Sequence, residues 1–325
     1  MYARTSAATR TSTTTASALL GVTALMLPGA ATASTGPGDA PAPVPASAAT
    51  ATATATGTAV TTADAPRAGG PLVIAHRGAS AYAPENTLAA VERAAELGVD
   101  WVENDVQRTR DGALVVIHDD TLLRTTDVER VFPDRAPWQV KDFTAAEIAR
   151  LDAGSWFGAR WAGERVPTLK QFLNTVDANR QKLLLEIKAS EQYPGIEKDI
   201  LRVLRQEGWL DRAHVEEKLV IQSFSADSVR AVHQRRPEIT TGFLGTPATA
   251  ELPAYAAFTD QINPSYTSLT AGYVAAVHRL KGPHGKPLTV STWTVNDAAG
   301  AVRVRDLGAD GIITNNPDVV RDAVG

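Results

Sequence analysis

The residues best suited to chemistry in this sequence are two histidines that flank a pair of acids. His76 and His118 lie near the two ends of segment 72–120, and Glu103 and Asp105 lie between them, separated by one residue. Two imidazoles can divide proton transfer, one accepting a proton and the other donating one. Carboxylates gathered near them can hold a divalent cation through oxygen ligands. The segment therefore predicts acid–base catalysis beside a bound metal ion.

A single hairpin is expected to bring these groups together. Residues 101–106 are typical of a strand, so the alternate side chains of Glu103 and Asp105 share one face. Asp111 and Gly112 form the dipeptide that a two-residue hairpin turn prefers, because glycine tolerates a positive φ. A turn centred on this dipeptide places Asp105 directly opposite His118, with the Cβ atoms about 5 Å apart. Pattern alone thus predicts that a histidine and two carboxylates meet.

Eight short apolar segments define the expected architecture. They are predicted strands at 72–75, 101–106, 183–187, 218–223, 239–244, 260–263, 288–292 and 311–313, and a return strand at 114–117 is extra. Helical patterns follow most of them, and alternation of strand and helix predicts a parallel sheet. Eight such units predict an α/β fold of the (β/α)8 TIM-barrel type over residues 71–325, close to the usual length of about 250 residues.

Residues 119–166 interrupt the alternation as a small insertion after the second strand. This segment contains Trp138, Trp156, Phe157 and Trp161. A connection of this length is usually a functional loop or a small inserted element. We expect it to form a lid or one wall of the site. The alternative is that its aromatic side chains only pack the insertion onto the barrel.

Candidate site residues stand at the carboxyl ends of several predicted strands, where active sites of this barrel type lie. His76 and Arg77 end the first strand, Glu103 and Asp105 the second, Glu186 and Lys188 the third, and Trp293 the seventh. We therefore expect one shared site. The other four histidines lie away from strand ends and are expected at the surface: His214, His233, His278 and His284.

Helix signals and nearby asparagines leave some assignments open. Asn86 is an N-cap candidate for the first helix, and it could instead contact a substrate or metal. Thr168 follows Pro167 and is expected to begin another helix. Asn315 and Asn316 follow the last strand, and they either cap the final helix or reach the site.

The carboxylates of Glu103, Asp105 and Glu186 would repel one another if they were buried without counter-charges. A divalent cation would remove that cost, and an all-oxygen ligand set favours Ca2+ or Mg2+ over Zn2+. One alternative is a structural ion network with Arg77 and Lys188 that needs no metal. A zinc site on the two histidines is a less favoured alternative. Arg77 and Lys188 are also suited to binding phosphate oxygens.

These residues belong to an ordered set of sequence blocks that resembles the glycerophosphodiester phosphodiesterase family. The blocks are HRG at 76–78, PENT at 84–87, E-x-D at 103–105, HD at 118–119, RTTD at 124–127, LEIK at 185–188, STWTVN at 291–296 and GADGIITNNPD at 308–318. The resemblance extends over about residues 71–325. A lone HRG would be weak evidence, whereas the ordered set is specific.

The resemblance implies metal-dependent hydrolysis of glycerophosphodiesters to sn-glycerol 3-phosphate and an alcohol. It implies His76 and His118 as the acid–base pair, without fixing which is the base or whether water or a glycerol hydroxyl attacks first. Glu103, Asp105 and Glu186 match the family's metal-ligand positions. Trp293 lies in a family block and is interpreted as a platform for the glycerol carbons, the alternative being a core residue at the barrel mouth.

Two other functions fit parts of the pattern. A phospholipase of the phospholipase D or phosphoinositide type would act on intact lipids or lysolipids, and it would need an apolar or basic rim on the insertion. A catalytically inactive surface binding module would be expected to have lost histidines or acids. None of the matching histidines and acids is missing here.

The remaining sequence limits location and partners. The net charge is −4 with no basic run, which gives no case for nucleic-acid binding, and cysteine is absent. Residues 1–33 are interpreted as a signal peptide with an apolar stretch at 16–27, too short for the ~20 residues of a membrane span. We expect an exported protein without stable membrane insertion, and an Ala/Thr/Pro-rich disordered linker at 34–70. The oligomeric state stays open.

Overall fold

Eight parallel strands form a nearly closed barrel in the computed structural model, which describes residues 70–325. In barrel order they are β7 (Gln261–Asn263), β6 (Thr240–Leu244), β5 (Leu219–Ser223), β4 (Lys182–Ile187), β2 (Trp101–Arg108), β1 (Leu72–Ala75), β9 (Gly311–Thr314) and β8 (Ser291–Thr292). The order follows the chain around the barrel, apart from β3, which pairs only with β2. The predicted TIM-barrel class and all eight predicted strand positions are confirmed.

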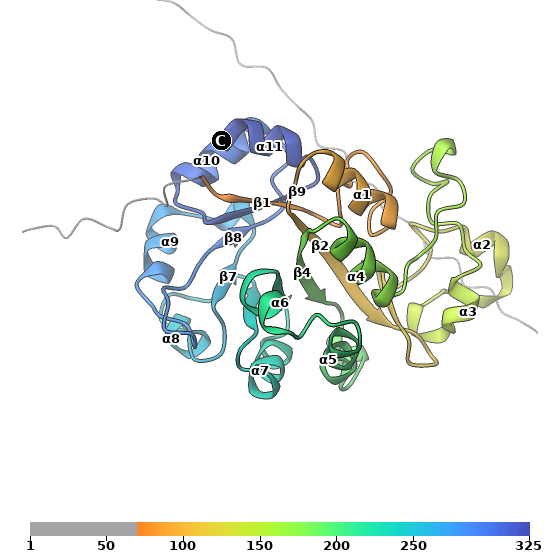
Figure 1. Cartoon of the computed structure of the whole chain (residues 1–325), viewed down its shortest axis with the longest axis horizontal. Helices are drawn as coiled ribbons and strands as arrows, with labels where there is room; N and C mark the ends of the chain where they lie inside the picture. Colours follow the sequence, from red (N-terminus) through yellow and green to blue (C-terminus); the bar gives the residue numbers. More distant parts are fainter. Residues whose placement is uncertain (1–69) are drawn as a thin grey trace, which may run out of the picture. The chain divides into compact units, whose positions relative to one another are not determined.

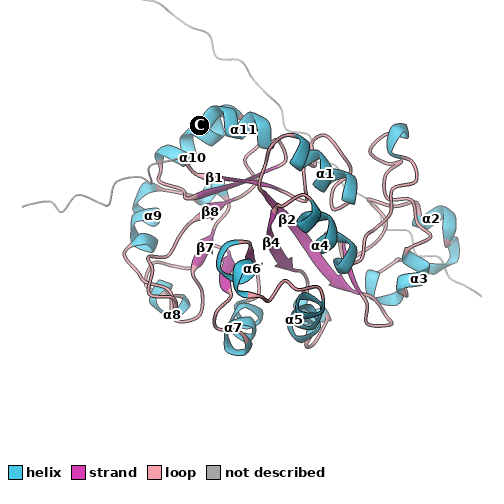
Figure 2. Cartoon of the chain, viewed as in Figure 1, coloured by secondary structure: helices cyan, strands magenta, loops and turns pink. Residues whose placement is uncertain are grey.

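Helices cover the outside of this barrel (Figures 1 and 2). They are α1 (Leu88–Glu96), α4 (Leu169–Ala178), α5 (Ile196–Gln206), α6 (Arg212–Glu217), α7 (Ala226–Arg235), α8 (Leu252–Tyr255), α9 (Ala271–His278), α10 (Ala298–Asp306) and α11 (Pro317–Val324). The short helix α6, which precedes β5, was not predicted from the sequence. It spans only six residues, too few for a clear helical repeat.

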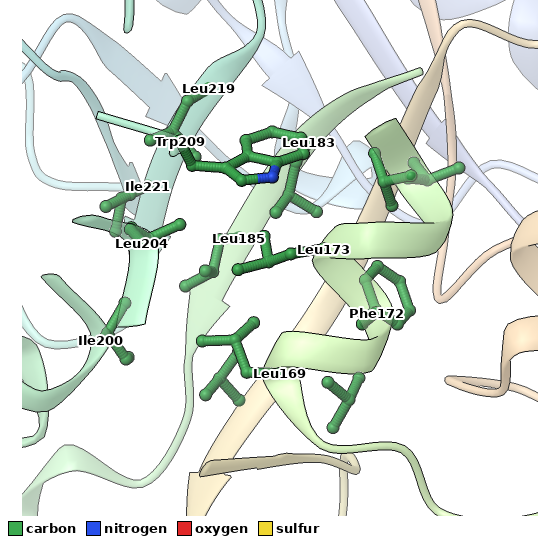
Figure 3. Close-up of a cluster of buried hydrophobic side chains, with 14 of the residues drawn as sticks. Leu169, Phe172, Leu173, Leu183, Leu185, Ile200, Leu204, Trp209, Leu219 and Ile221 are labelled. Carbon is green, nitrogen blue, oxygen red and sulfur yellow. The ribbon is translucent and has the colours of Figure 1, made fainter. Parts of the chain in front are cut away.

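Strand β4 shows how the sequence builds both layers of the core. Leu183 and Leu185 point outward and pack with residues of α4 and α5, in the cluster drawn in Figure 3. Leu184 points inward and packs with Ile74 and Val220 at the base of the barrel. A strand buried on both faces needs this continuous apolar run. Glu186, on the inward face two residues after Leu184, is therefore an acid that follows an apolar run.

The barrel is least regular between β7 and β8. β8 has only two residues, and it pairs in the regular ladder with β9 alone. On the β7 side the backbone makes isolated bridges, with the Ile262 amide donating to the Thr289 carbonyl at 3.0 Å. The side chain of Asn263 also joins the two sides, because its Oδ1 accepts the Ser291 amide at 3.1 Å. A side chain thus helps to close the barrel here.

The predicted hairpin is present, but its predicted register is wrong by one residue. β2 pairs with β3 (Leu114–Val116) so that Val106 faces Val116, and the amide of Ile117 donates to the carbonyl of Asp105. The amide of Thr109 still donates to the carbonyl of Ala113, so the turn consists of the three residues 110–112. Gly112 adopts a φ of +84° within it. Asp105 therefore does not face His118 across the ladder.

The cap of α1 is also one residue from its predicted position. Thr87, rather than Asn86, caps the helix, with its Oγ1 accepting the amide of Ala90 at 3.3 Å. Asn86 has a φ of +60°, which lies outside the usual cap conformation, and its side chain turns to the barrel interior. The predicted start of α4 at Thr168 is confirmed by reciprocal hydrogen bonds with Gln171.

The insertion forms a small unit of its own beside the hairpin (Figure 1). It contains α2 (Val128–Val131), α3 (Ala145–Ile148) and short 3-10 turns at Pro133–Arg135, Val140–Asp142 and Ala159–Trp161. Its apolar residues pack on Val115 and Ile117 of the hairpin. Trp161 packs on the alanines that begin α1, and Trp156 is 41% exposed. The insertion is therefore packed onto the barrel, and Thr125, Ala153 and Val166 of the insertion also line the cavity beside His118, so it forms part of one wall there.

No helix within residues 70–325 is both long enough and apolar enough to cross a membrane. The predicted signal peptide at 1–33 lies outside the described residues. The same holds for the predicted linker at 34–70, apart from Gly70.

Candidate active site

Three buried carboxylates meet inside the barrel at the carboxyl ends of β2 and β4. Glu103 and Asp105 project inward from β2, and Asp105 is the direct neighbour of Glu186 in the pairing with β4. One oxygen from each residue lies within 4.8 Å of the other two. The sequence predicted this cluster correctly, because alternation along a strand puts residues 103 and 105 on the same face.

Burial and mutual repulsion make the three acids hard to ionise together. Burial, followed by the charges of Asp105 and Glu186, raises the pKa of Glu103 well above its ordinary value. Burial and then Asp105 raise the pKa of Glu186 to about 7. Burial alone would raise the pKa of Asp105, but Arg77, Lys188 and other partners outweigh it and lower that pKa.

Two cations partly balance the cluster. The Nζ of Lys188 lies 2.9 Å from Oε1 of Glu186 and 3.8 Å from Oδ1 of Asp105. The Nε of Arg77 lies 3.2 Å from Oδ2 of Asp105. The contacts of the predicted ion network are thus present. Three carboxylates against two cations still leave an excess of one negative charge.

Two carboxylate oxygens of the cluster lack a hydrogen-bond partner with suitable geometry, Oδ1 of Asp105 and Oε1 of Glu186. Buried polar atoms of this kind are normally satisfied by a partner, a water or an ion. The unsatisfied oxygens, the excess negative charge and the all-carboxylate ligand set together fit one hard divalent cation. The three acids could therefore hold a metal ion.

Arg77 serves the site with both its backbone and its side chain. It adopts a φ of +58°, a left-handed conformation that is uncommon outside glycine. In this conformation its amide donates to Oε2 of Glu103 at 2.9 Å. Its Nη1 donates to Oε1 of Glu85 at 2.8 Å. The residue that was predicted to bind phosphate therefore also fixes one of the acids.

His76 leaves the end of β1 and is held by the loop after β9. Its Nδ1 lies 2.6 Å from Oδ1 of Asn315. Burial, and then the adjacent positive charge of Arg77, lowers the pKa of His76 to about 4. The imidazole is therefore neutral near pH 7 and can accept a proton. Of the two roles considered for Asn315, contact with the site is the one observed.

His118 reaches the same site from the end of the hairpin, where it lies close to Asp105. Its Nδ1 lies 2.7 Å from Oδ1 of Asp119, the next residue in the chain. It lines a small cavity together with Glu85 and Asn86, and its charge acts on Asp105. The predicted gathering of the histidine and the acids is thus present, although the predicted ladder pairing is not.

Asn86 holds Asp105 in place rather than capping a helix. Its Nδ2 donates to Oδ2 of Asp105 at 2.8 Å, and its Oδ1 accepts the Asp105 amide at 3.3 Å. This two-way contact crosses from the loop after β1 to β2. In the sequence, the only feature that points to this contact is the position of Asn86 in the PENT block.

Trp293 lies at the barrel mouth, half-buried over the inner apolar cluster. Its Nε1 donates to the carbonyl of Asn263 at 2.9 Å. Its ring meets the ring of Phe224 edge to face, with centroids 5.4 Å apart. Phe224 is 51% exposed and has the ammonium of Lys188 5.5 Å from its ring centroid. Both possible roles of Trp293, core residue and exposed platform, are compatible with this position.

Phe224, Asp119 and Arg124 are site residues that sequence reasoning did not identify. Phe224 directly follows the apolar run of β5, so it resembles one more core residue. Asp119 contacts His118, and Arg124 contacts both Asp119 and Glu85. The four remaining histidines do not join the site: His284 is exposed, and His214, His233 and His278 are half-buried. Their expected surface location is confirmed for His278 and His284, whose side chains are 36% and 31% exposed.

Comparison with known proteins gives a consistent result. Residues 76–319 match the profile of the glycerophosphoryl diester phosphodiesterase family. A glycerophosphodiester phosphodiesterase of Caldanaerobacter subterraneus subsp. tengcongensis is 37% identical over 261 residues, covering 78% of this chain and 97% of the relative. A glycerophosphodiester phosphodiesterase of Bacillus subtilis is 34% identical over 265 residues, covering 76% of this chain and 84% of the relative.

A solved structure shows the same relationship. A phosphodiesterase of Oleispira antarctica, in complex with the product sn-glycerol-3-phosphate, superposes with a TM-score of 0.68 at 28% identity. The match covers 78% of this chain and 96% of that protein. The chain belongs to the glycerophosphoryl diester phosphodiesterase family, whose members are phosphoric diester hydrolases.

Proposed function

We propose that this protein is an exported, metal-dependent enzyme that hydrolyses glycerophosphodiesters to sn-glycerol 3-phosphate and an alcohol. The observation that carries the proposal is the cluster of three buried acids at the barrel mouth, with His76 at the end of β1 and His118 at the end of the hairpin both close to Asp105. The family assignment and the product named for the Oleispira antarctica structure support the substrate class. Export is supported by the sequence of residues 1–33 alone.

The proposed metal ligands are Glu103, Asp105 and Glu186, which offer oxygen atoms only. One Ca2+ or Mg2+ ion suits such ligands better than Zn2+ does. When bound, it would neutralise charge that develops on the phosphate oxygens. Arg77 and Lys188, which border the acids, would add positive charge for the same phosphate.

The two histidines would divide the proton work. His76 has a pKa of about 4, so it is neutral near pH 7 and suits the general base that deprotonates the attacking oxygen. His118, with Asp119 on its Nδ1, would donate a proton from Nε2 to the leaving alkoxide. The attacking oxygen belongs either to water or to a glycerol hydroxyl of the substrate. Trp293 would provide a face for the glycerol carbons.

The decisive assay measures release of glycerol 3-phosphate from a panel of glycerophosphodiesters. The purified protein is first treated with a chelator, and Ca2+ or Mg2+ is then restored. We expect activity to fall with the chelator and to return with one of the ions. Lysophosphatidylcholine, added as a separate substrate, tests action on lysolipids. If His76→Ala and His118→Ala both retain wild-type activity, the proposed mechanism is wrong.

A further inference from the structure

Arg124 of the insertion joins two acids that border the site. Its Nε and Nη2 donate to the two carboxylate oxygens of Asp119 at 2.6 and 2.9 Å. Its Nη1 and Nη2 donate to the two oxygens of Glu85, both at 2.8 Å. Both contacts are therefore bidentate, and the planar guanidinium is suited to this geometry.

Each of these acids in turn holds a residue of the proposed mechanism. Oδ1 of Asp119 lies 2.7 Å from Nδ1 of His118. Glu85 accepts from Nη1 of Arg77 at 2.8 Å. Arg124 thus stands in the middle of a continuous series of contacts that runs from His118 to Arg77. No other residue described between 70 and 325 has hydrogen bonds to both Asp119 and Glu85.

The charges explain why the central arginine matters. Without Arg124, Glu85 would have Arg77 as its only cationic partner and would compete with the phosphate for it. Asp119 would lose the bidentate contact that fixes its plane, and with it the fixed direction of the His118 ring. A hydrogen bond from Arg124 also keeps the pKa of Asp119 well below its usual range, so that Asp119 stays ionised.

We propose that Arg124 is a positioning residue for the hydrolysis proposed above. It fixes His118 through Asp119 and Arg77 through Glu85, and so sets the distance between the proton donor and the phosphate-binding guanidinium. The insertion therefore takes part in the reaction through the contacts of Arg124. This inference rests on the proposed function.

A double-mutant cycle tests whether Arg124 acts through Asp119. Arg124→Gln is expected to lower kcat/KM about 10–100-fold, the usual loss when a supporting partner is removed. Asp119→Asn should lower it by a similar factor, and the double variant should be no worse than the more impaired single variant. Losses that multiply in the double variant, or full activity in Arg124→Gln, would overturn the inference.

Further variants separate positioning from simple loss of structure. Arg124→Lys keeps the charge but lacks the planar fork, so it should recover only part of the activity. Arg130→Gln is the matched control, since Arg130 lies in the same insertion and pairs with Asp127 at the surface. It should keep wild-type kcat and KM. If Arg130→Gln loses as much activity as Arg124→Gln, the insertion serves stability alone.

A spectroscopic readout keeps this test distinct from the test of the proposed function. Nitrogen-15 spectra of the histidine rings report which ring nitrogen carries the proton. In the wild type, Nδ1 of His118 should carry a proton in both the neutral and the charged ring, so that only Nε2 gains or loses the proton that is donated. In Arg124→Gln, the neutral ring should show a mixture of the two tautomers. If the wild type released no glycerol 3-phosphate, the proposed function would fail, and these spectra would still decide the inference. Identical spectra in both proteins would overturn it.

Discussion

Nδ1 of His76 lies 2.6 Å from Oδ1 of Asn315, so the loop after β9 orients the imidazole that ends β1. The two strands are neighbours, and Ala75 pairs with Thr314, which brings the following residues side by side. An amide oxygen can only accept a hydrogen bond, so Nδ1 carries the proton. Nε2 is then left unprotonated, as a general base requires.

We expect Asn315→Leu to lower kcat about 10–100-fold, because the ring loses the contact that fixes its tautomer. Asn315→Asp should keep more activity, but its negative charge favours the protonated imidazole and raises the His76 pKa above about 4. The acidic limb of its pH–rate profile should therefore move to higher pH. Asn316→Ala is the neighbouring control, and an equal loss there would contradict the assignment.

Metal binding should depend on pH through Glu186, whose pKa is raised to about 7 from an ordinary value of 4.5. The folded protein then holds this proton more tightly than the unfolded chain does. Its contribution to stability is complete below about pH 4.5 and falls as pH rises towards about 7. The proposed metal ion would bind the ionised carboxylate and so offset this loss.

We therefore expect Ca2+ or Mg2+ to raise the Tm of chelator-treated protein little at pH 5 and much more at pH 8. Thermal unfolding from pH 5 to pH 8, with and without each ion, measures the effect. Glu186→Gln should remove most of the difference between the two pH values. A thermal shift that is the same at every pH would count against Glu186 as a ligand.

The leaving group separates the roles of the two histidines. On glycerophosphocholine, removal of either imidazole should lower kcat about 10²–10⁴-fold. A p-nitrophenolate leaving group needs no proton, so with such a substrate the loss in His118→Ala should shrink to a few-fold. His76→Ala should stay impaired on both substrates. The reverse pattern would exchange the two roles.

Gly78 should be indispensable for the loop that carries His76 and Arg77. Its φ is +78°, and a Cβ at this position would lie 2.6 to 2.7 Å from atoms of Ala90 in α1. Gly78→Ala is expected to lower the free energy of unfolding by about 2–4 kcal/mol, from left-handed strain and overpacking. Gly112→Ala is the control, with a φ of +84° and no atom within 4 Å.

In Gly112→Ala, the left-handed strain alone should lower the free energy of unfolding by about 1–2 kcal/mol. Urea unfolding of both variants measures the difference, which isolates the effect of the close approach to α1. Equal losses in the two variants would show that α1 yields to the added methyl group.

The sequence was most informative where a side chain's direction follows from the strand repeat. Glu103, Asp105 and Glu186 could be placed in one cluster because alternate residues of β2 share one face and the acids lie near the carboxyl ends of neighbouring strands. The turn could not be resolved in the same way. A glycine with positive φ suits both a two-residue and a three-residue turn, and Gly112 belongs to the latter.

Contacts between distant segments could not be predicted at all. Arg124 and Glu85 are 39 residues apart, and only the folded insertion brings them together. Asn86 and Thr87 are both good cap residues, and local preference does not distinguish them. The contact of Asn86 with Asp105, across 19 residues, decides between them in the structure.

The irregular closure between β7 and β8 implies that the backbone amides of the barrel are protected from hydrogen exchange to different degrees. In native-state hydrogen exchange, the amides of Ile262 and Ser291 should exchange through small local openings, whereas those in the middle of β2 and β4 should require far larger ones. Trp293 stands on the side that opens and the three acids stand across from it. Local opening of this wall would then let the proposed substrate enter or its products leave, while Glu103, Asp105 and Glu186 keep their spacing.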